Sequence, residues 1–111
     1  IIKTEIERLK ERCSPSEQYF IWGVTDNTLK LNNVIKELFP QWKLVGVYDR
    51  MVRGQFEGYD IVPIEELSYS DDSICFVAAP KAWEQAKETF KNNRVRYILV
   101  DFNDVNWTMR L

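Results

Sequence analysis

The chain has 111 residues and a mass of 13.2 kDa, which is enough for one domain rather than two. Fifteen basic and seventeen acidic residues give a net charge of −2 and a sequence pI of about 5.2, so the composition offers no basic footprint for nucleic acid and no polybasic membrane anchor. The absence of histidine excludes a Ser-His-Asp triad, a histidine general base and every zinc site with a histidine ligand.

Residues 1–17 are expected to form a leading amphipathic helix and a linker. Apolar residues recur at the helical spacings of four, three and four at Ile2, Ile6, Leu9 and Cys13. Pro15 then ends the helix, because proline excludes the residue before it from helical conformation. Since the chain opens on Ile1 rather than methionine, we expect it to be part of a longer protein, with neighbouring domains or a second copy of the chain as partners.

Short apolar segments alternate with helical segments over residues 18–102. Strands are predicted at 19–22, 43–48, 60–62, 74–79 and 95–100. A helix is predicted over 31–39, with Thr25, Asp26 and Asn27 as candidate N-caps, and a second begins at Pro80. Residues 50–59 are expected to form a loop and 64–67 a single helical turn. The C-terminal tail, 103–111, has no clear period and is expected to continue into the rest of the protein.

This alternation predicts an α/β domain over residues 18–102. Its expected architecture is a three-layer, doubly wound parallel sheet of about five strands in the order 3-2-1-4-5, with helices on both faces. Ligands bind such sheets at the switch point, between the first and fourth strands and at their carboxyl ends. The residues that follow these strands are therefore the candidate binding residues.

Three segments are expected to meet at the switch point. The turn from Gly23 to Thr28 would offer backbone N–H groups and the positive end of a helix dipole to a phosphate. Asp49 falls 49 − 23 = 26 residues after Gly23, near the position of a carboxylate that accepts hydrogen bonds from ribose hydroxyls. Arg50 and Arg53 follow in a loop and would meet a 2′-phosphate or a sugar phosphate. Ala79 follows the fourth strand.

Three stretches of the chain carry a family resemblance. They are residues 21–28 (Ile-Trp-Gly-Val-Thr-Asp-Asn-Thr), 45–49 (Val-Gly-Val-Tyr-Asp) and 56–67 (Phe-Glu-Gly-Tyr-Asp-Ile-Val-Pro-Ile-Glu-Glu-Leu). In this order they resemble the small Rossmann-like NAD(P)- or nucleotide-sugar-binding domains attached to bacterial sugar-modifying and polysaccharide-biosynthesis enzymes. The first stretch departs from the family's glycine-rich turn, because Thr25 and Thr28 stand where the second and third glycines would be.

The resemblance implies a non-catalytic nucleotide- or nucleotide-sugar-binding module of a larger bacterial sugar- or polysaccharide-modifying protein. NAD(P) or a nucleotide-sugar is the implied ligand, and no catalytic residue or metal ligand is expected. The implied contact residues are Gly23, Thr25, Asp26, Asn27, Thr28, Asp49, Arg50 and Ala79. The alternative is a degenerate scaffold that binds no nucleotide and associates through exposed apolar residues near Ile1, Ile2 or Trp107. An NAD(P)-dependent oxidoreductase is the third candidate.

The cysteines and the apolar runs predict a location. Cys13 and Cys75 lie far apart in different predicted elements, which favours free thiols over a structural disulfide. No charged-then-apolar signal segment opens the chain, and no apolar run is long enough to span a bilayer. We therefore expect a cytoplasmic protein without membrane insertion.

Overall fold

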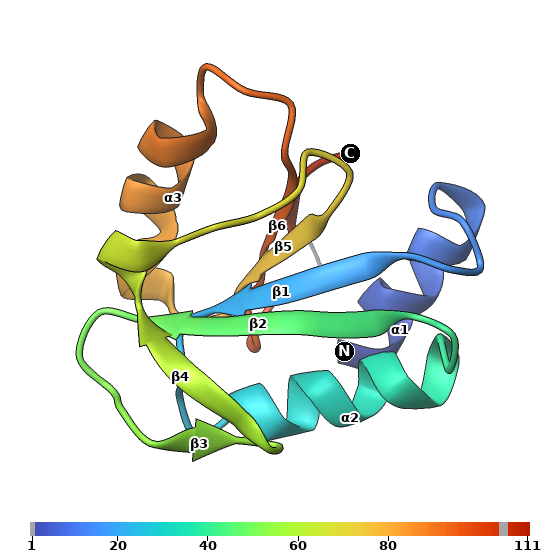
Figure 1. Ribbon diagram of the computed structural model, residues 1–111. Helices are drawn as coiled ribbons and strands as arrows, with labels where there is room; N and C mark the ends of the chain where they lie inside the picture. Colours follow the sequence, from blue (N-terminus) through green and yellow to red (C-terminus); the bar gives the residue numbers. More distant parts are fainter. Residues whose placement is uncertain (1, 105–106) are drawn as a thin grey trace.

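The computed structural model describes residues 2–104 and 107–111 (Figure 1). The strands are β1 (Gln18–Trp22), β2 (Lys43–Asp49), β3 (Gln55–Phe56), β4 (Tyr59–Pro63), β5 (Ile74–Val77), β6 (Arg96–Leu99) and β7 (Thr108–Arg110). The α-helices are α1 (Ile2–Glu7), α2 (Thr28–Leu38) and α3 (Trp83–Phe90). Single 3₁₀ turns occupy Arg8–Glu11, Ile64–Glu66 and Pro80–Ala82.

The strands form one mixed sheet in the order β3-β4-β2-β1-β5-β6-β7. Strands β4, β2, β1, β5 and β6 pair in parallel, whereas the edge strands β3 and β7 pair antiparallel with β4 and β6. The prediction of an α/β fold is confirmed. The prediction of a purely parallel sheet of about five strands is wrong, because the two short edge strands extend it to seven in the described part of the chain.

Both additional strands come from segments that we expected to be irregular. In the predicted loop 50–59, Glu57 and Gly58 both have positive φ, of 50° and 82°. Two consecutive residues of this conformation make the tight turn that suits a hairpin, and β3 pairs back onto β4 through it. In the predicted tail, Thr108–Arg110 pair with β6. Residues 105 and 106 of that tail lie outside the described residues.

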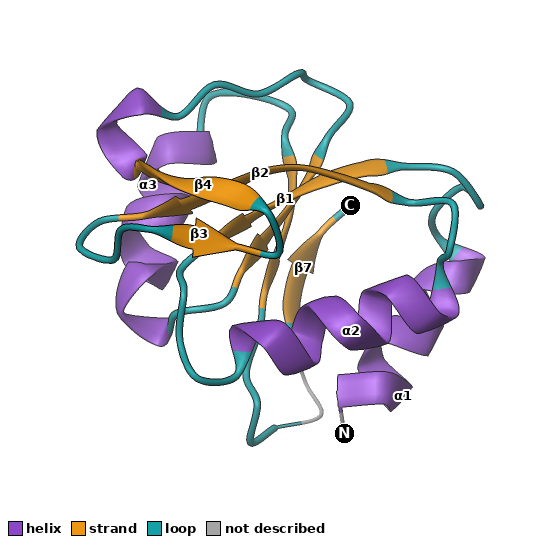
Figure 2. Ribbon diagram, turned by 60° about the horizontal axis from the view of Figure 1, so that its bottom comes forward, coloured by secondary structure: helices purple, strands orange, loops and turns teal. Residues whose placement is uncertain are grey.

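Helices cover both faces of the sheet (Figure 2). Because successive side chains of a strand point to opposite faces, Tyr19 and Ile21 of β1 pack under α1 and α2, while Phe20 and Trp22 pack with α3 on the other side. Each face therefore has its own apolar core. No helix in the described ranges is long and apolar enough to cross a bilayer.

The two ends of the chain pack into the same core as α2. Ile2 is 6% exposed and Trp107 is 8% exposed, and both belong to the cluster under α1 and α2. The Trp107 indole N–H donates to the carbonyl oxygens of Asp101, at 2.6 Å, and Asp104, at 3.0 Å. The expectation that Ile2 and Trp107 form an exposed apolar surface is wrong, and Ile1 lies outside the described residues.

Candidate functional site

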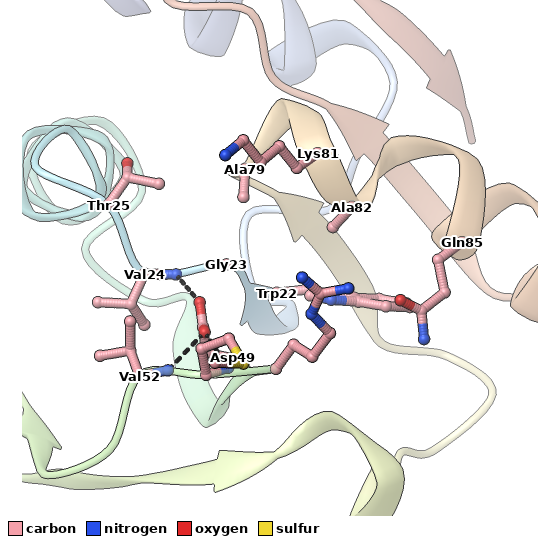
Figure 3. A pocket seen from close by; sticks show the side chains of 12 residues that line it. Trp22, Gly23, Val24, Thr25, Asp49, Val52, Ala79, Lys81, Ala82 and Gln85 are labelled. Atoms are coloured by element: carbon pink, nitrogen blue, oxygen red, sulfur yellow. Dashed lines mark hydrogen bonds between the residues drawn. The ribbon is translucent and has the colours of Figure 1, made fainter.

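A cavity of about 330 Å³ opens at the carboxyl ends of β1, β2 and β5 (Figure 3). The chain leaves β1 toward one face of the sheet and β5 toward the other, so the cavity lies at the switch point of the sheet. We call it the switch-point cavity. Its lining residues are Trp22, Gly23, Val24, Thr25, Asp49, Arg50, Met51, Val52, Ala79, Lys81, Ala82 and Gln85.

Only glycine fits at position 23, because the segment after β1 lies very close to the segment after β5 there. Its φ is +105°, and a Cβ at this position would lie 2.5 Å from the Cβ and 2.7 Å from the backbone nitrogen of Ala79. The Gly23 N–H donates to the carbonyl oxygen of Tyr48 at 2.8 Å. The glycine therefore allows the segment after β1 to pass against the segment after β5, which is a packing role.

The turn between β1 and α2 uses its backbone donors internally. The N–H of Val24 donates to Asp49 Oδ2 at 2.7 Å, and the N–H of Thr25 donates to Thr28 Oγ1 at 2.8 Å. The N–H of Asn27 donates to Thr25 Oγ1 at 3.2 Å. These N–H groups belong to the turn that would receive a phosphate in the resembled family. Here they are already bonded to side chains of the protein.

Thr28 is the buried centre of this turn. Its hydroxyl donates to the carbonyl oxygen of Gly23 at 3.0 Å and accepts the bond from Thr25. Asn27 occupies the N-cap position of α2, but its side chain makes no capping hydrogen bond. Thr25 and Thr28 are therefore the residues that close the turn, and they do so through their hydroxyl groups.

Asp49 ties the turn after β1 to the loop after β2. Its Oδ2 accepts from Val24, and its Oδ1 accepts from the N–H groups of Met51 and Val52, both at 2.8 Å. A carboxylate has about four acceptor positions, so about one remains for a ligand. Burial by itself would raise the pKa of Asp49, but the backbone N–H donors outweigh it and hold the pKa below its ordinary value. The carboxylate is therefore an anchor of the site's backbone.

Two cationic side chains reach the switch-point cavity from different strands. Arg50 follows β2, and Lys81 lies in the 3₁₀ turn after β5. Both are exposed, and neither forms an ion pair with any residue in the described ranges. Arg53, in contrast, donates to the carbonyl oxygens of Asp49 and Val52 and so braces its own loop. The cavity thus combines unpaired positive charge with the apolar side chains of Met51 and Val52.

The structure brings together only part of the predicted set. Gly23, Thr25, Asp49, Arg50 and Ala79 line the switch-point cavity. Asp26, Asn27 and Thr28 do not line it. The sequence interpretation missed Lys81 and Gln85, although Pro80 had been placed at the start of the helix after the fourth strand. The residue after that proline necessarily lies at the same edge of the sheet, and this signal would have identified Lys81.

In the described part of the chain, no group of three or more Cys, Asp or Glu side chains is placed to hold a metal ion. Comparison with family models, with curated proteins and with solved structures gives no match to this chain.

Proposed function

We propose that the chain is a non-catalytic, Rossmann-like module that binds a nucleotide or a nucleotide-sugar in the switch-point cavity, as part of a larger bacterial sugar- or polysaccharide-modifying protein. The observation that carries the proposal is the presence of two unpaired cations, Arg50 and Lys81, at the switch point of an α/β sheet. Cytoplasmic location belongs to the same proposal.

The mode of phosphate binding differs from that of a glycine-rich turn. Because the N–H groups of Val24, Thr25 and Asn27 are already used, the phosphates are held by side chains, through the guanidinium of Arg50 and the ammonium of Lys81. Gln85 supplies an amide that both donates and accepts, which suits a sugar hydroxyl. Met51 and Val52 offer an apolar surface to the base.

The closed turn also supports a second candidate, a scaffold that binds no nucleotide. The hydrogen bonds of Asp49 and Thr28 satisfy the turn without any ligand, so the fold does not need a phosphate for its own stability. The two candidates differ in one respect: only the binding module requires the charges of Arg50 and Lys81.

Isothermal titration calorimetry of the purified chain with NAD, NADP and a UDP-sugar distinguishes the candidates. We expect binding of at least one of them, weakened about tenfold by Lys81→Gln or Arg50→Gln, since loss of one charge-assisted contact corresponds to about 1.4 kcal/mol. Lys30→Gln, an exposed lysine of α2 that does not line the cavity, is the matched control and should leave the affinity unchanged. Absence of heat with all three ligands at millimolar concentration would support the scaffold and reject the module.

A further inference from the structure

A second cavity lies between the amino-terminal helix and the last strand, apart from the switch point. It has a volume of about 510 Å³. We call it the α1–β7 cavity, because its lining residues come from α1, from the 3₁₀ turn Arg8–Glu11 and the residue after it, and from β7 and the residue before it. None of them lines the switch-point cavity, so this is a separate site.

A buried carboxylate faces this cavity with an unused acceptor. Glu5 lines the cavity and is only 1% exposed, and its Oε1 accepts no hydrogen bond from any residue in the ranges 2–104 and 107–111. Arg8 forms an ion pair with this oxygen at 3.4 Å but no hydrogen bond, and the Arg8 side chain is 62% exposed. Buried charges in folded proteins are almost always both paired and hydrogen-bonded. The free acceptor position therefore indicates that an occupant of the cavity donates to Glu5.

The walls of the cavity are apolar and fixed before any ligand arrives. Leu9 and Trp107 are buried in the core under α1 and α2, and Met109 packs against that core. The Trp107 indole is held by its hydrogen bonds to the carbonyl oxygens of Asp101 and Asp104. An apolar wall with a few polar groups is the usual composition of a small-molecule site. Because the indole is already ordered, a ligand that packs on it loses little binding energy to ordering the protein.

The charges of the cavity restrict what such a ligand is. A carboxylate only accepts hydrogen bonds, so Glu5 requires a donor, and an ammonium group makes the stronger, charge-assisted bond. The Arg8 guanidinium only donates and suits a carboxylate. Glu11 and Arg12, the other two charged residues of the lining, are exposed and opposite in charge. The lining is therefore balanced in charge, which favours a zwitterion over a simple amine or a simple acid.

We propose that the α1–β7 cavity binds an α-amino acid with an apolar side chain. Its ammonium group donates to Glu5, and its carboxylate accepts from Arg8. Both charges of an α-amino acid are attached to one carbon, which matches a carboxylate and a guanidinium that lie 3.4 Å apart. The apolar side chain packs against Leu9, Trp107 and Met109.

NMR titration of the chain with L-phenylalanine tests the proposal, with the Trp107 indole N–H and the Leu9 backbone amide as reporters. We expect saturable shifts of both signals. Phenethylamine lacks the carboxylate and 3-phenylpropionate lacks the ammonium group, so each should bind about tenfold more weakly. L-Phenylalaninamide, which has the ammonium group of a peptide N-terminus but no free carboxylate, should behave like phenethylamine.

Matched variants separate binding from folding. Glu5→Gln keeps the size of the side chain and should weaken L-phenylalanine about tenfold. It should be as stable as the original chain in urea, because it removes a buried charge that has no hydrogen bond at Oε1. Arg8→Gln should weaken L-phenylalanine by a similar factor but leave phenethylamine almost unaffected. Lys10→Gln, an exposed lysine of the same 3₁₀ turn that does not line the cavity, should have no effect.

Three results would overturn the proposal. The first is unchanged reporter signals at millimolar L-phenylalanine. The second is equal affinity for L-phenylalanine and phenethylamine, or an equal loss of affinity in Lys10→Gln and Glu5→Gln. The third is a marked loss of stability in Glu5→Gln together with full affinity in Arg8→Gln, which would assign the carboxylate a structural role.

Discussion

One carboxylate organises each end of the parallel strands, and the two carboxylates act in different ways. At the carboxyl ends, Asp49 accepts from three backbone N–H groups of two loops. At the amino ends, Glu17 precedes β1 and forms a two-point ion pair with Arg96 of β6, with both N···O distances at 3.0 Å. Arg96 also donates to the carbonyl oxygen of Asp72, before β5.

The difference determines which groups stay available for a ligand. Asp49 accepts hydrogen bonds from backbone N–H groups and forms no ion pair with the nearby cations Arg50 and Lys81. Glu17 instead pairs with the Arg96 guanidinium, and neither of these two residues lines the switch-point cavity. Substitutions at one end at a time therefore separate the contributions of the two carboxylates.

The largest expected effect comes from adding a Cβ at Gly23, where the segments after β1 and β5 approach each other. Gly23→Ala should reduce the free energy of unfolding by about 4 kcal/mol, because it adds a clash with Ala79 to the strain of a positive φ. Gly54→Ala is the matched control: its φ is +104°, but nothing lies within 4 Å of the added Cβ. It should lose only about 1 kcal/mol. Equal losses in chemical denaturation would show that strain alone, and not the approach of the two segments, accounts for Gly23.

Asp49→Asn should have the second largest effect. The amide keeps one acceptor oxygen but places N–H donors against the backbone N–H groups of Val24 or of Met51 and Val52. We expect a loss of about 2 kcal/mol in urea denaturation, because backbone N–H donors of both loops, that of Val24 partly buried, lose their charged acceptor. A variant as stable as the original chain would mean that the turn does not depend on this carboxylate.

Glu17→Gln should cost less, about 1 kcal/mol, because the ion pair with Arg96 is partly solvated and Arg96 keeps its bond to Asp72. Denaturant titration at moderate and at high salt measures the effect. The difference from the original chain should shrink as salt is added, since salt screens the charge interaction. A loss of unfolding free energy larger than that of Asp49→Asn would show that Glu17, at the amino ends of the strands, contributes more to stability than Asp49, at their carboxyl ends.

The smallest expected effect is the change in the free energy of unfolding at acid pH. This measurement tests Glu17 and Asp49 together. The hydrogen bond and charge of Arg96 hold the pKa of Glu17 below its ordinary value, and the pKa of Asp49 is lowered as well. A carboxyl group with a lowered pKa in the folded state stabilises the protein above its unfolded pKa, and this stability is lost as pH falls through the folded pKa.

The free energy of unfolding should therefore fall as the pH drops below about 4.5. The double variant E17Q/D49N should show a shallower fall over the same range. If its acid dependence matched that of the original chain, other carboxyl groups would be responsible.

Segments with a strong apolar pattern could be predicted from the sequence. The run at 74–79 indicated a strand buried on both faces, and β5 is buried along its whole length. The hairpin at Glu57 was missed because glutamate rarely adopts positive φ, so only Gly58 suggested a turn. Strand β7 has three residues, and its position depends on β6 rather than on its own pattern.

The sequence predicted the position of the candidate site better than the roles of its side chains. The strand order located the switch point, which is why Gly23, Asp49 and Ala79 meet there. From the sequence, Thr25 and Thr28 were identified only as departures from a glycine-rich turn, and no role was predicted for their hydroxyl groups. Their hydrogen bonds with the backbone of the turn depend on three-dimensional geometry that no spacing reveals.

The central claim is that Arg50 and Lys81 make the switch-point cavity a binding site for a nucleotide-type anion. NMR titration of the chain with a UDP-sugar, followed through its backbone amides, tests this claim most directly. The account predicts saturable shifts at Gly23, Arg50 and Lys81, lost in the Lys81→Gln variant while its spectrum remains that of a folded protein. Unchanged signals at these residues at millimolar ligand, or the same shifts in the variant, would contradict it.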